Sequence, residues 1–375
     1  MKNRLFLLAT TLVVSAPILF AQQTSAGSSD PHPKKPHQST TSPPATPAPE
    51  KRLASGDLHP DEAHEKGCGA IAIGLDPDMA ASQRENFETR NHFAIEFQKI
   101  RTSLALVSTS LMPGESIEIG ADPLGESIDF EAEAEGGSLE QLNDTKWRWT
   151  APEEPGHHCV HIIDQATKET TCLNVFVLVP YDGSEELNGY QIGKYQKKPL
   201  HGRKAYEVPE GFIEVTQDNQ DLWVSPHFQL RQFLCRQKSD YPKYVRLDPK
   251  LLIKLELILQ EVQQAGIPAH SFYVVSGYRT PYYNSSIGNK TKYSRHFYGD
   301  AADIFVDIDD DGKIDDLNDD DQVTNEDPRF LFNLVDSLVD QENYQPYKGG
   351  LGFYGINEAR TGFIHVDVRG QKVRW

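Results

Sequence analysis

Two histidines and one aspartate in the last part of the chain have the side-chain types of a metal site. His296 and Asp303 are seven positions apart, with Gly299 between them to allow a tight turn, and His365 lies on a separate predicted strand. One histidine alone would more simply be a core or surface residue, so the argument depends on the set of three. Two imidazoles and one carboxylate suit zinc and leave a fourth coordination position open, as catalytic zinc sites do. Zinc in such a site lowers the pKa of bound water to about 7 and polarises a substrate carbonyl group.

Apolar periodicity and capping residues predict the elements that must position these side chains. Leucine, isoleucine and valine recur at helical spacing over 249–265, which predicts a helix that Gly266 ends. The other predicted elements are a helix starting at Ser225-Pro226, strands over 272–276 and 304–306, and a last helix starting at Asp327-Pro328. Residues 225–375 are therefore expected to form an α+β domain, a small antiparallel sheet with flanking helices.

The motif Ser294-x-His296-x-x-Gly299-x-Ala301-x-Asp303 resembles the signature of the D-alanyl-D-alanine carboxypeptidase-like zinc peptidases (LAS-type murein peptidases). The ending Gly-Gly-Leu-Gly-Phe-Tyr (349–354) and Phe-Ile-His-Val-Asp (363–367) is similar to the branch of murein endopeptidases with a single catalytic domain. The resemblance covers 225–375 and implies that His296, Asp303 and His365 are the zinc ligands. It also implies that Arg279 holds the substrate or stabilises the oxyanion, the alternative being an arginine in a structural ion pair.

One position departs from the family pattern. Members that end in Glu-x-x-His place a catalytic glutamate three residues before the third ligand, and Gly362 stands there in this chain. Asp367 is a candidate base, because it follows His365 by two residues and would face the same side of the strand. The competing interpretation is that Asp367 orients a ligand imidazole without touching the reacting water.

An acidic segment, 307–327, follows the strand of Asp303 and holds eleven acidic residues and one lysine. Such concentrated negative charge repels itself unless a cation binds. Its first part matches an EF-hand-type loop, whose predicted Ca²⁺ ligands are Asp307, Asp309, Asp311, Lys313, Asp315 and Asn318. Asn318 stands where a bidentate glutamate is usual. We expect a structural calcium site, and the alternative is a solvated acidic loop.

The first half of the chain has a different composition. Residues 22–66 are rich in Pro, Ser and Thr and predict a disordered linker. Residues 67–182 carry short β runs between turn-forming clusters, which resembles an all-β, immunoglobulin-like sandwich, and 183–224 are expected to form an ordered connector. The candidate disulfides are Cys159 with Cys172, on two arms of a predicted hairpin, and Cys68 with Cys235. Four cysteines allow three connectivities, and the sequence does not choose among them.

Charge and the N-terminus limit the partners and the location. The 375 residues include 37 lysines and arginines against 55 aspartates and glutamates, a formal net charge of −18. This acidity argues against a nucleic-acid partner, since phosphate binding requires a basic surface. Residues 1–21 have the form of a signal peptide, with an apolar run too short for a membrane span. We expect an exported protein of the periplasm or cell envelope, with no membrane span after cleavage.

These observations favour an exported zinc metallopeptidase. By resemblance, it would hydrolyse amide bonds of peptidoglycan stem peptides or cross-links, as a D,D- or L,D-endopeptidase or a carboxypeptidase. The absence of a glutamate at position 362 keeps a second hypothesis open, a non-catalytic cell-wall binding or signalling module with a zinc fold. A third, a calcium-dependent adhesion protein built on the sandwich, explains the acidic segment but leaves the His/Asp/His set without a role. The sequence does not define the oligomeric state or the bond that is cut.

Overall fold

The computed structural model describes residues 89–124 and 129–375. The predicted signal peptide (1–21), the predicted linker (22–66), the start of the predicted sandwich and Cys68 lie outside these residues. Within the described ranges, no helix has the length and hydropathy needed to cross a membrane.

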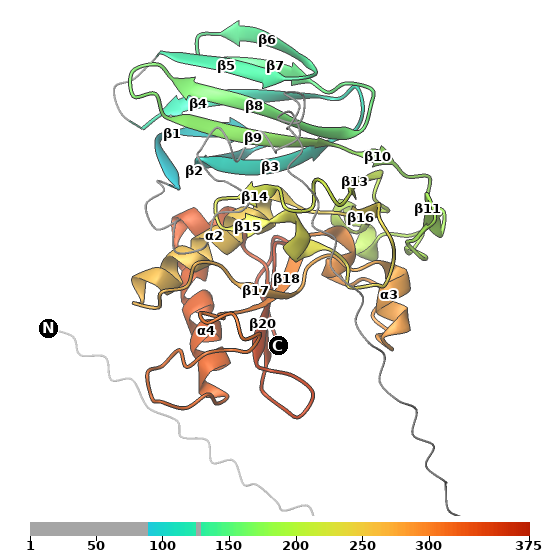
Figure 1. Cartoon of the computed structure of the whole chain (residues 1–375), viewed down its shortest axis with the longest axis vertical. Helices are drawn as coiled ribbons and strands as arrows, with labels where there is room; N and C mark the ends of the chain where they lie inside the picture. The colour runs from blue at the N-terminus through green and yellow to red at the C-terminus, as the bar shows by residue number, and fades with distance from the viewer. Residues whose placement is uncertain (1–88, 125–128) are drawn as a thin grey trace, which may run out of the picture. The chain divides into compact units, whose positions relative to one another are not determined.

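The first nine strands form two sheets, coloured blue to green in Figure 1. One sheet has the order β2-β1-β4-β7-β6 and the other β3-β9-β8-β5, and β3 and β9 are the parallel pair. The strands are β1 (Arg90–Phe97), β2 (Ile100–Leu104), β3 (Leu106–Leu111), β4 (Ser116–Pro123), β5 (Phe130–Glu135), β6 (Ser138–Asn143), β7 (Lys146–Thr150), β8 (Gly156–Asp164) and β9 (Thr170–Val177).

Alternating burial along these strands places one face of each sheet in a common core. In β4, Ile117 and Ile119 are buried, whereas Ser116 and Glu118 are exposed. The core includes the fully buried Trp149 and residues of both sheets. This two-sheet arrangement agrees with the expected all-β sandwich, and its relation to immunoglobulin domains stays a prediction.

The cysteines can be compared with the predicted pairs. Cys159 on β8 and Cys172 on β9 are both buried, and their Sγ atoms lie 2.7 Å apart. The structure therefore brings the two sulfur atoms of the first predicted pair together, and the covalent bond between them stays a prediction. Cys235 is buried in the C-terminal core, and its predicted partner Cys68 lies outside the described residues.

The C-terminal part is organised around a five-stranded sheet of order β17-β18-β20-β19-β21, coloured orange to red in Figure 1. Its neighbours are antiparallel except β19 and β21. The strands of this part are β10 (Val179–Pro180), β11 (Glu186–Leu187), β12 (Tyr190–Gln191), β13 (Gly211–Val215), β14 (Trp223–Ser225), β15 (Phe228–Gln229), β16 (Lys243–Val245), β17 (Tyr273–Ser276), β18 (Ala301–Phe305), β19 (Gly350–Tyr354), β20 (Phe363–Asp367) and β21 (Val373–Arg374). The α-helices are α2 (Pro249–Gln264), α3 (Pro281–Ser286) and α4 (Glu326–Ser337). Short 3₁₀ helices are η3 (Leu200–Gly202), η4 (Lys204–Tyr206), η5 (Leu230–Phe233), η6 (Arg295–Tyr298), η7 (Leu338–Asp340) and η8 (Glu342–Tyr347).

Two of the three predicted helices are present, and one is wrong. Helix α2 begins where Asp248 caps it, accepting a hydrogen bond from Lys250 N at 2.8 Å, and α4 packs against β19 and β20. No helix starts at Ser225-Pro226, because β14 and β15 form a hairpin there. The Ser225 hydroxyl donates to Glu256 Oε1 of α2 at 2.6 Å instead of capping a helix.

The predicted connector, 183–224, is part of the C-terminal core. Tyr190, Ile192 and Phe212 are buried in the same apolar cluster as α2 and the five-stranded sheet. Gly193 lies so close to α3 that a Cβ atom there would come within 2.5 Å of Tyr282 N. Residues outside the predicted α+β domain therefore help to support the elements that carry the predicted metal ligands.

Candidate active site

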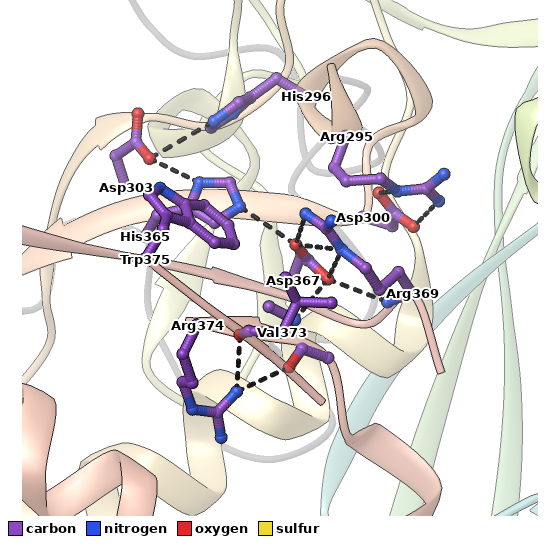
Figure 2. Close-up of polar contacts among 12 residues, drawn as sticks. Arg295, His296, Asp300, Asp303, His365, Asp367, Arg369, Val373, Arg374 and Trp375 are labelled. Atoms are coloured by element: carbon purple, nitrogen blue, oxygen red, sulfur yellow. Dashed lines mark hydrogen bonds and ion pairs between the residues drawn. The ribbon is translucent and has the colours of Figure 1, made fainter. Parts of the chain in front are cut away.

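The three predicted zinc ligands meet at one place on the five-stranded sheet. Asp303 on β18 is the cross-strand partner of His365 on β20, and His296 comes from η6 just before β18. Oδ1 of Asp303 lies 2.8 Å from Nδ1 of His365 and 3.3 Å from Nε2 of His296, so the carboxylate stands between the two rings (Figure 2). All three side chains are buried, and their donor atoms lie within 4.8 Å of one another.

A tight turn brings His296 back onto the strand of Asp303. Gly299 has a φ of +72°, and a Cβ atom there would lie 2.1 Å from Arg246 O, so no other residue fits without moving the backbone. Ala301 and Ala302 are fully buried and small, which lets β18 lie close to its neighbours. The glycine and the alanines of the motif therefore place the ligands without taking part in the chemistry.

Each imidazole is held at the nitrogen that faces away from the site. Nδ1 of His296 lies 2.7 Å from the carbonyl oxygen of Gly277, and Nε2 of His365 lies 3.2 Å from Oδ2 of Asp367. A carbonyl and a carboxylate only accept, so both of these nitrogens donate when the other nitrogen of each ring holds a metal. Without a metal, His296 Nε2 and His365 Nδ1 face the Asp303 carboxylate, which also only accepts. Two neutral imidazoles and one carboxylate, each fixed from outside, fit the donor set that zinc requires.

The titration of the three groups follows from burial and from their contacts. Burial lowers the pKa of His296, which favours the neutral imidazole that a metal needs. Burial also lowers the pKa of His365, but hydrogen bonds to Asp303 and Asp367 outweigh the effect of burial, so the pKa of His365 is raised. Burial raises the pKa of Asp303, yet the two imidazoles outweigh burial and hold this pKa far below its usual range. The carboxylate is therefore ionised and ready to bind a cation.

Arg279 lies against one of the predicted metal ligands. Its Nη2 is 2.5 Å from Oδ2 of Asp303, the oxygen that does not face His365, and its Nε donates to Ser276 Oγ at 2.6 Å. The guanidinium is mostly buried, with 16% of the side chain exposed. The structure thus places Arg279 at the site, in an ion pair that fixes the orientation of the ligand carboxylate.

Asp367 contacts the edge of the His365 ring that is opposite to the edge facing Asp303. It is fully buried, accepts a hydrogen bond from Gly350 N at 2.8 Å and pairs with Arg369. Burial raises its pKa, but hydrogen bonds from His365 and Arg369 outweigh this and keep the pKa far below its usual range. Of the two predicted roles, this geometry favours the orienting one, because the carboxylate touches the protonated nitrogen rather than the open side of the site.

The packing around Gly362 leaves no room for the glutamate that other family members have at this position. It immediately precedes β20, and a Cβ atom there would lie 2.5 Å from Cγ of Pro328 on α4. The residue that does share the face of His365 at this end of β20 is Phe363. The absence of the glutamate is therefore matched by the surrounding packing, so a single substitution would not restore it.

Two further residues at the site were not predicted from the sequence. The Trp375 ring lies 5.1 Å from that of His365, and a Cβ atom at Gly352 would lie 2.6 Å from it, so this glycine was the available signal. Lys254 of α2 is buried and donates to Asp367 O at 2.7 Å, and burial lowers its pKa to about 7. Its signal was a lysine placed in the apolar stripe of the helix.

The acidic segment forms a loop in which part of the predicted calcium set meets. Carboxylate oxygens of Asp307, Asp309 and Asp315 lie within 4.8 Å of one another, and Asp307 accepts hydrogen bonds from the backbone of Asp311 and Gly312. The other predicted ligands are engaged elsewhere: Asp311 accepts from Lys313 N and Nζ, and Asn318 donates to Asp320.

This segment also contains a structural repeat that was not predicted from the sequence. Asp316 accepts from the backbone of Asp320 and Asp321, as Asp307 does from Asp311 and Gly312. Positive φ angles at Asp310 and Gly312 recur nine residues later at Asp319 and Asp321. The signal was the nine-residue spacing between corresponding acidic positions.

Comparison with known proteins gives one match. Residues 226–325 match the family model described as Peptidase M15. No curated protein and no solved structure matches the chain. The matched range contains Arg279, His296 and Asp303, and His365 lies beyond it. Zinc-dependent hydrolysis is typical of this family, so the match supports a metallopeptidase: residues 226–325 are similar to the M15 peptidases.

Proposed function

We propose that the chain is an exported zinc peptidase that hydrolyses amide bonds in peptidoglycan stem peptides or their cross-links. The observation that carries this proposal is the convergence of His296 Nε2, Asp303 Oδ1 and His365 Nδ1, with the opposite nitrogen of each ring held by an acceptor. A purely structural zinc site would be closed by a fourth protein ligand. The described contacts of the three ligands include no fourth donor of that kind. The resemblance to the D-alanyl-D-alanine carboxypeptidase-like branch supports peptidoglycan as the substrate.

The roles of the surrounding residues follow from their contacts. Zinc, when bound, supplies a Lewis acid that lowers the pKa of water and polarises the amide carbonyl. Gly277 O and Asp367 keep the two imidazoles in the tautomers that bind metal. Arg279 fixes Asp303 and places a positive charge beside the site, where it counters the negative charge that develops on the carbonyl oxygen.

Peptidoglycan digestion tests the proposal. Full-length protein is incubated with purified peptidoglycan, with zinc or with chelator, and the products are identified by mass spectrometry. We expect new muropeptides that disappear with chelator and with His296→Ala, whereas His270→Ala, a histidine outside the ligand set, leaves them unchanged. Bound zinc without any product from cross-linked or uncross-linked wall would contradict the peptidase and favour the non-catalytic module, which the glycine at 362 keeps as the second candidate.

The acidic loop supports a second, structural proposal. We propose that the loop starting at Asp307 binds Ca²⁺ through Asp307, Asp309 and Asp315, whose oxygens already lie together. Ile314, within this loop, is buried and its N–H donates to Thr361 Oγ1 at 3.0 Å, on the turn before β20. A bound cation would therefore stiffen the neighbourhood of the strand that carries His365.

A further inference from the structure

An aromatic surface continues from the metal site along one face of the sheet. We define the aromatic platform as Tyr354, Phe363 and Trp375. The Trp375 ring contacts His365, and its Nε1 donates to the Tyr354 hydroxyl at 2.9 Å. The rings of Tyr354 and Phe363 are stacked, with centroids 4.7 Å apart and planes 15° apart. Residue Trp375 is 47% exposed, so the platform borders the solvent beside a predicted metal ligand.

Strand register places the platform on the metal side of the sheet. Gly352 pairs with His365, and Tyr354 pairs with Phe363 two residues further along the same strands. Positions two apart face the same side and lie about 7 Å apart. The platform is therefore within reach of a substrate whose scissile amide is at the metal site.

Arg360 lies over the far end of the platform. Its guanidinium carbon is 5.2 Å from the centroid of Tyr354 and 5.5 Å from that of Phe363, and its Nε donates to Gly355 O at 3.1 Å. Mutual backbone hydrogen bonds with Asn357 fix it in the turn between β19 and β20. The side chain is therefore placed by the fold even though the residue is exposed.

The charge of Arg360 has no carboxylate partner among the described ion pairs, in a chain with a net charge of −18. The acidic loop adjoins the same turn through Ile314 and Thr361, yet none of its carboxylates reaches this guanidinium. An arginine stacked on aromatic rings presents its remaining donors in a fixed fork that matches a carboxylate.

Arg329 provides a contrast on the other face of the sheet. Its guanidinium carbon lies 3.5 Å from the centroid of Phe353, the strand neighbour of Tyr354, so the two arginines stack on opposite sides of β19. Arg329 belongs to α4, which covers that face, whereas Arg360 is exposed. Both arginines therefore stack on aromatic rings, but only Arg360 lies on the exposed side of the sheet that also carries His365.

We propose that Arg360 and the aromatic platform form a subsite that binds a carboxylate of the peptide substrate while the scissile amide lies at the metal site. This inference rests on the proposed peptidase function and specifies its substrate class. The rings exclude water from one side of the guanidinium, which strengthens its charge-assisted hydrogen bonds. Substrates with a free carboxylate at this position are preferred over their amidated counterparts.

Binding to the chelator-treated full-length protein tests the subsite without requiring turnover. Calorimetry compares a peptidoglycan stem peptide carrying its free carboxylates with the same peptide amidated at each carboxylate in turn. We expect one amidation to weaken binding about tenfold to a hundredfold, the usual range for a charge-assisted hydrogen bond. Arg360→Gln weakens binding of the free peptide by a similar factor and abolishes the discrimination, whereas Arg329→Gln leaves both unchanged.

Three results overturn the proposal, and the first two concern discrimination between the free and amidated peptides. One is equal affinity for the free and amidated peptides; the other is discrimination that survives in Arg360→Gln. If Phe363→Leu weakens binding while Arg360→Gln does not, the platform binds an apolar part of the ligand and the carboxylate assignment is wrong. Failure of the peptidase proposal is separate, because it appears as absence of peptidoglycan products from the zinc-loaded wild type, whatever the binding data show.

Discussion

Nε2 of His365 lies 3.2 Å from Oδ2 of Asp367, two residues further along the same strand, and this contact decides which nitrogen of the ring can bind metal. Nδ1 faces Asp303, 2.8 Å away, and with the proton held at Nε2 it would offer its lone pair to a bound metal. Asp367 is itself fixed by Arg369 and by Gly350 N. The arrangement makes Asp367 a positioning residue. Its removal is expected to lower the affinity for zinc rather than the rate of the chemical step.

Replacing Asp367 by asparagine tests this role. An asparagine can turn its NH₂ group toward Nε2 and so favour the wrong tautomer of His365. We expect zinc affinity to fall about tenfold to a hundredfold, and activity to return when zinc is raised to saturation. Competition with a chromophoric chelator measures the affinity, and muropeptide release at saturating zinc measures the chemistry. Asp336→Asn, which removes a carboxylate paired with Arg374 away from the ligands, serves as control.

The outcome also separates the two roles that the sequence left open. If Asp367 were the base, its loss would lower kcat by about 10² to 10⁴ even with zinc saturated, because proton transfer would be lost rather than metal binding. Unchanged zinc affinity together with such a loss of kcat would contradict the positioning role.

The convergence of the three predicted ligands could be anticipated from sequence because its geometry is mostly local. His296, Gly299 and Asp303 are joined by one turn and one strand, and His365 is the cross-strand partner of Asp303. The partners of these ligands could not be predicted in the same way. Gly277 O contacts His296, and Ser276 Oγ accepts from Arg279, because the end of β17 lies beside η6. The types of side chain in the sequence do not reveal that proximity.

The failed helix prediction shows a local signal overruled by tertiary contacts. Ser225-Pro226 has favourable capping chemistry, but the Glu256 carboxylate on α2 is buried and accepts hydrogen bonds from the Ser225 hydroxyl and from His227 N. A buried carboxylate without partners costs more than a helix cap contributes. The chain therefore forms the hairpin that satisfies Glu256.

Gly362 gives a prediction about the departure from the family pattern. Gly362→Glu is expected to leave peptidase activity no higher than that of the wild type, because the side chain would point toward Pro328 and away from His365. Gly362→Ala is expected to destabilise the fold by about 1–3 kcal/mol through overpacking. Urea unfolding measures the loss. In the control Gly156→Ala, the new Cβ atom meets only His158 Nε2 at 3.8 Å, an ordinary contact. Equal stability of the two alanine variants, or a gain of activity in Gly362→Glu, would show that the site at 362 is open.

Lys254 predicts a pH dependence of stability. Burial lowers its folded-state pKa to about 7, whereas an unfolded lysine titrates near about 10.4. Between these values Lys254 binds more protons in the unfolded chain than in the folded one. The contribution of Lys254 to the free energy of unfolding therefore increases as the pH rises from 7 to 10. Lys254→Met removes that contribution, so the stability of the wild type relative to the variant should increase over this range. Urea unfolding at each pH measures it, with Lys250→Met as a control from the same helix. A difference that stays constant or decreases would contradict a neutral Lys254 at high pH.

The acidic loop predicts stabilisation by calcium. A cation that binds only the folded protein raises the free energy of unfolding by about 2.7 kcal/mol at a hundredfold excess over its Kd. We therefore expect the Tm to rise with added Ca²⁺, and to rise less in Asp309→Asn, which removes one of the three converging carboxylates. Asp310→Asn is a matched control: it removes the same charge from the neighbouring position, where φ is +59° and asparagine is well tolerated. Thermal unfolding in calcium and in chelator distinguishes the cases. If both variants respond like the wild type, the three carboxylates are a solvated cluster, and if both lose the response equally, the effect is general charge screening rather than coordination by Asp309.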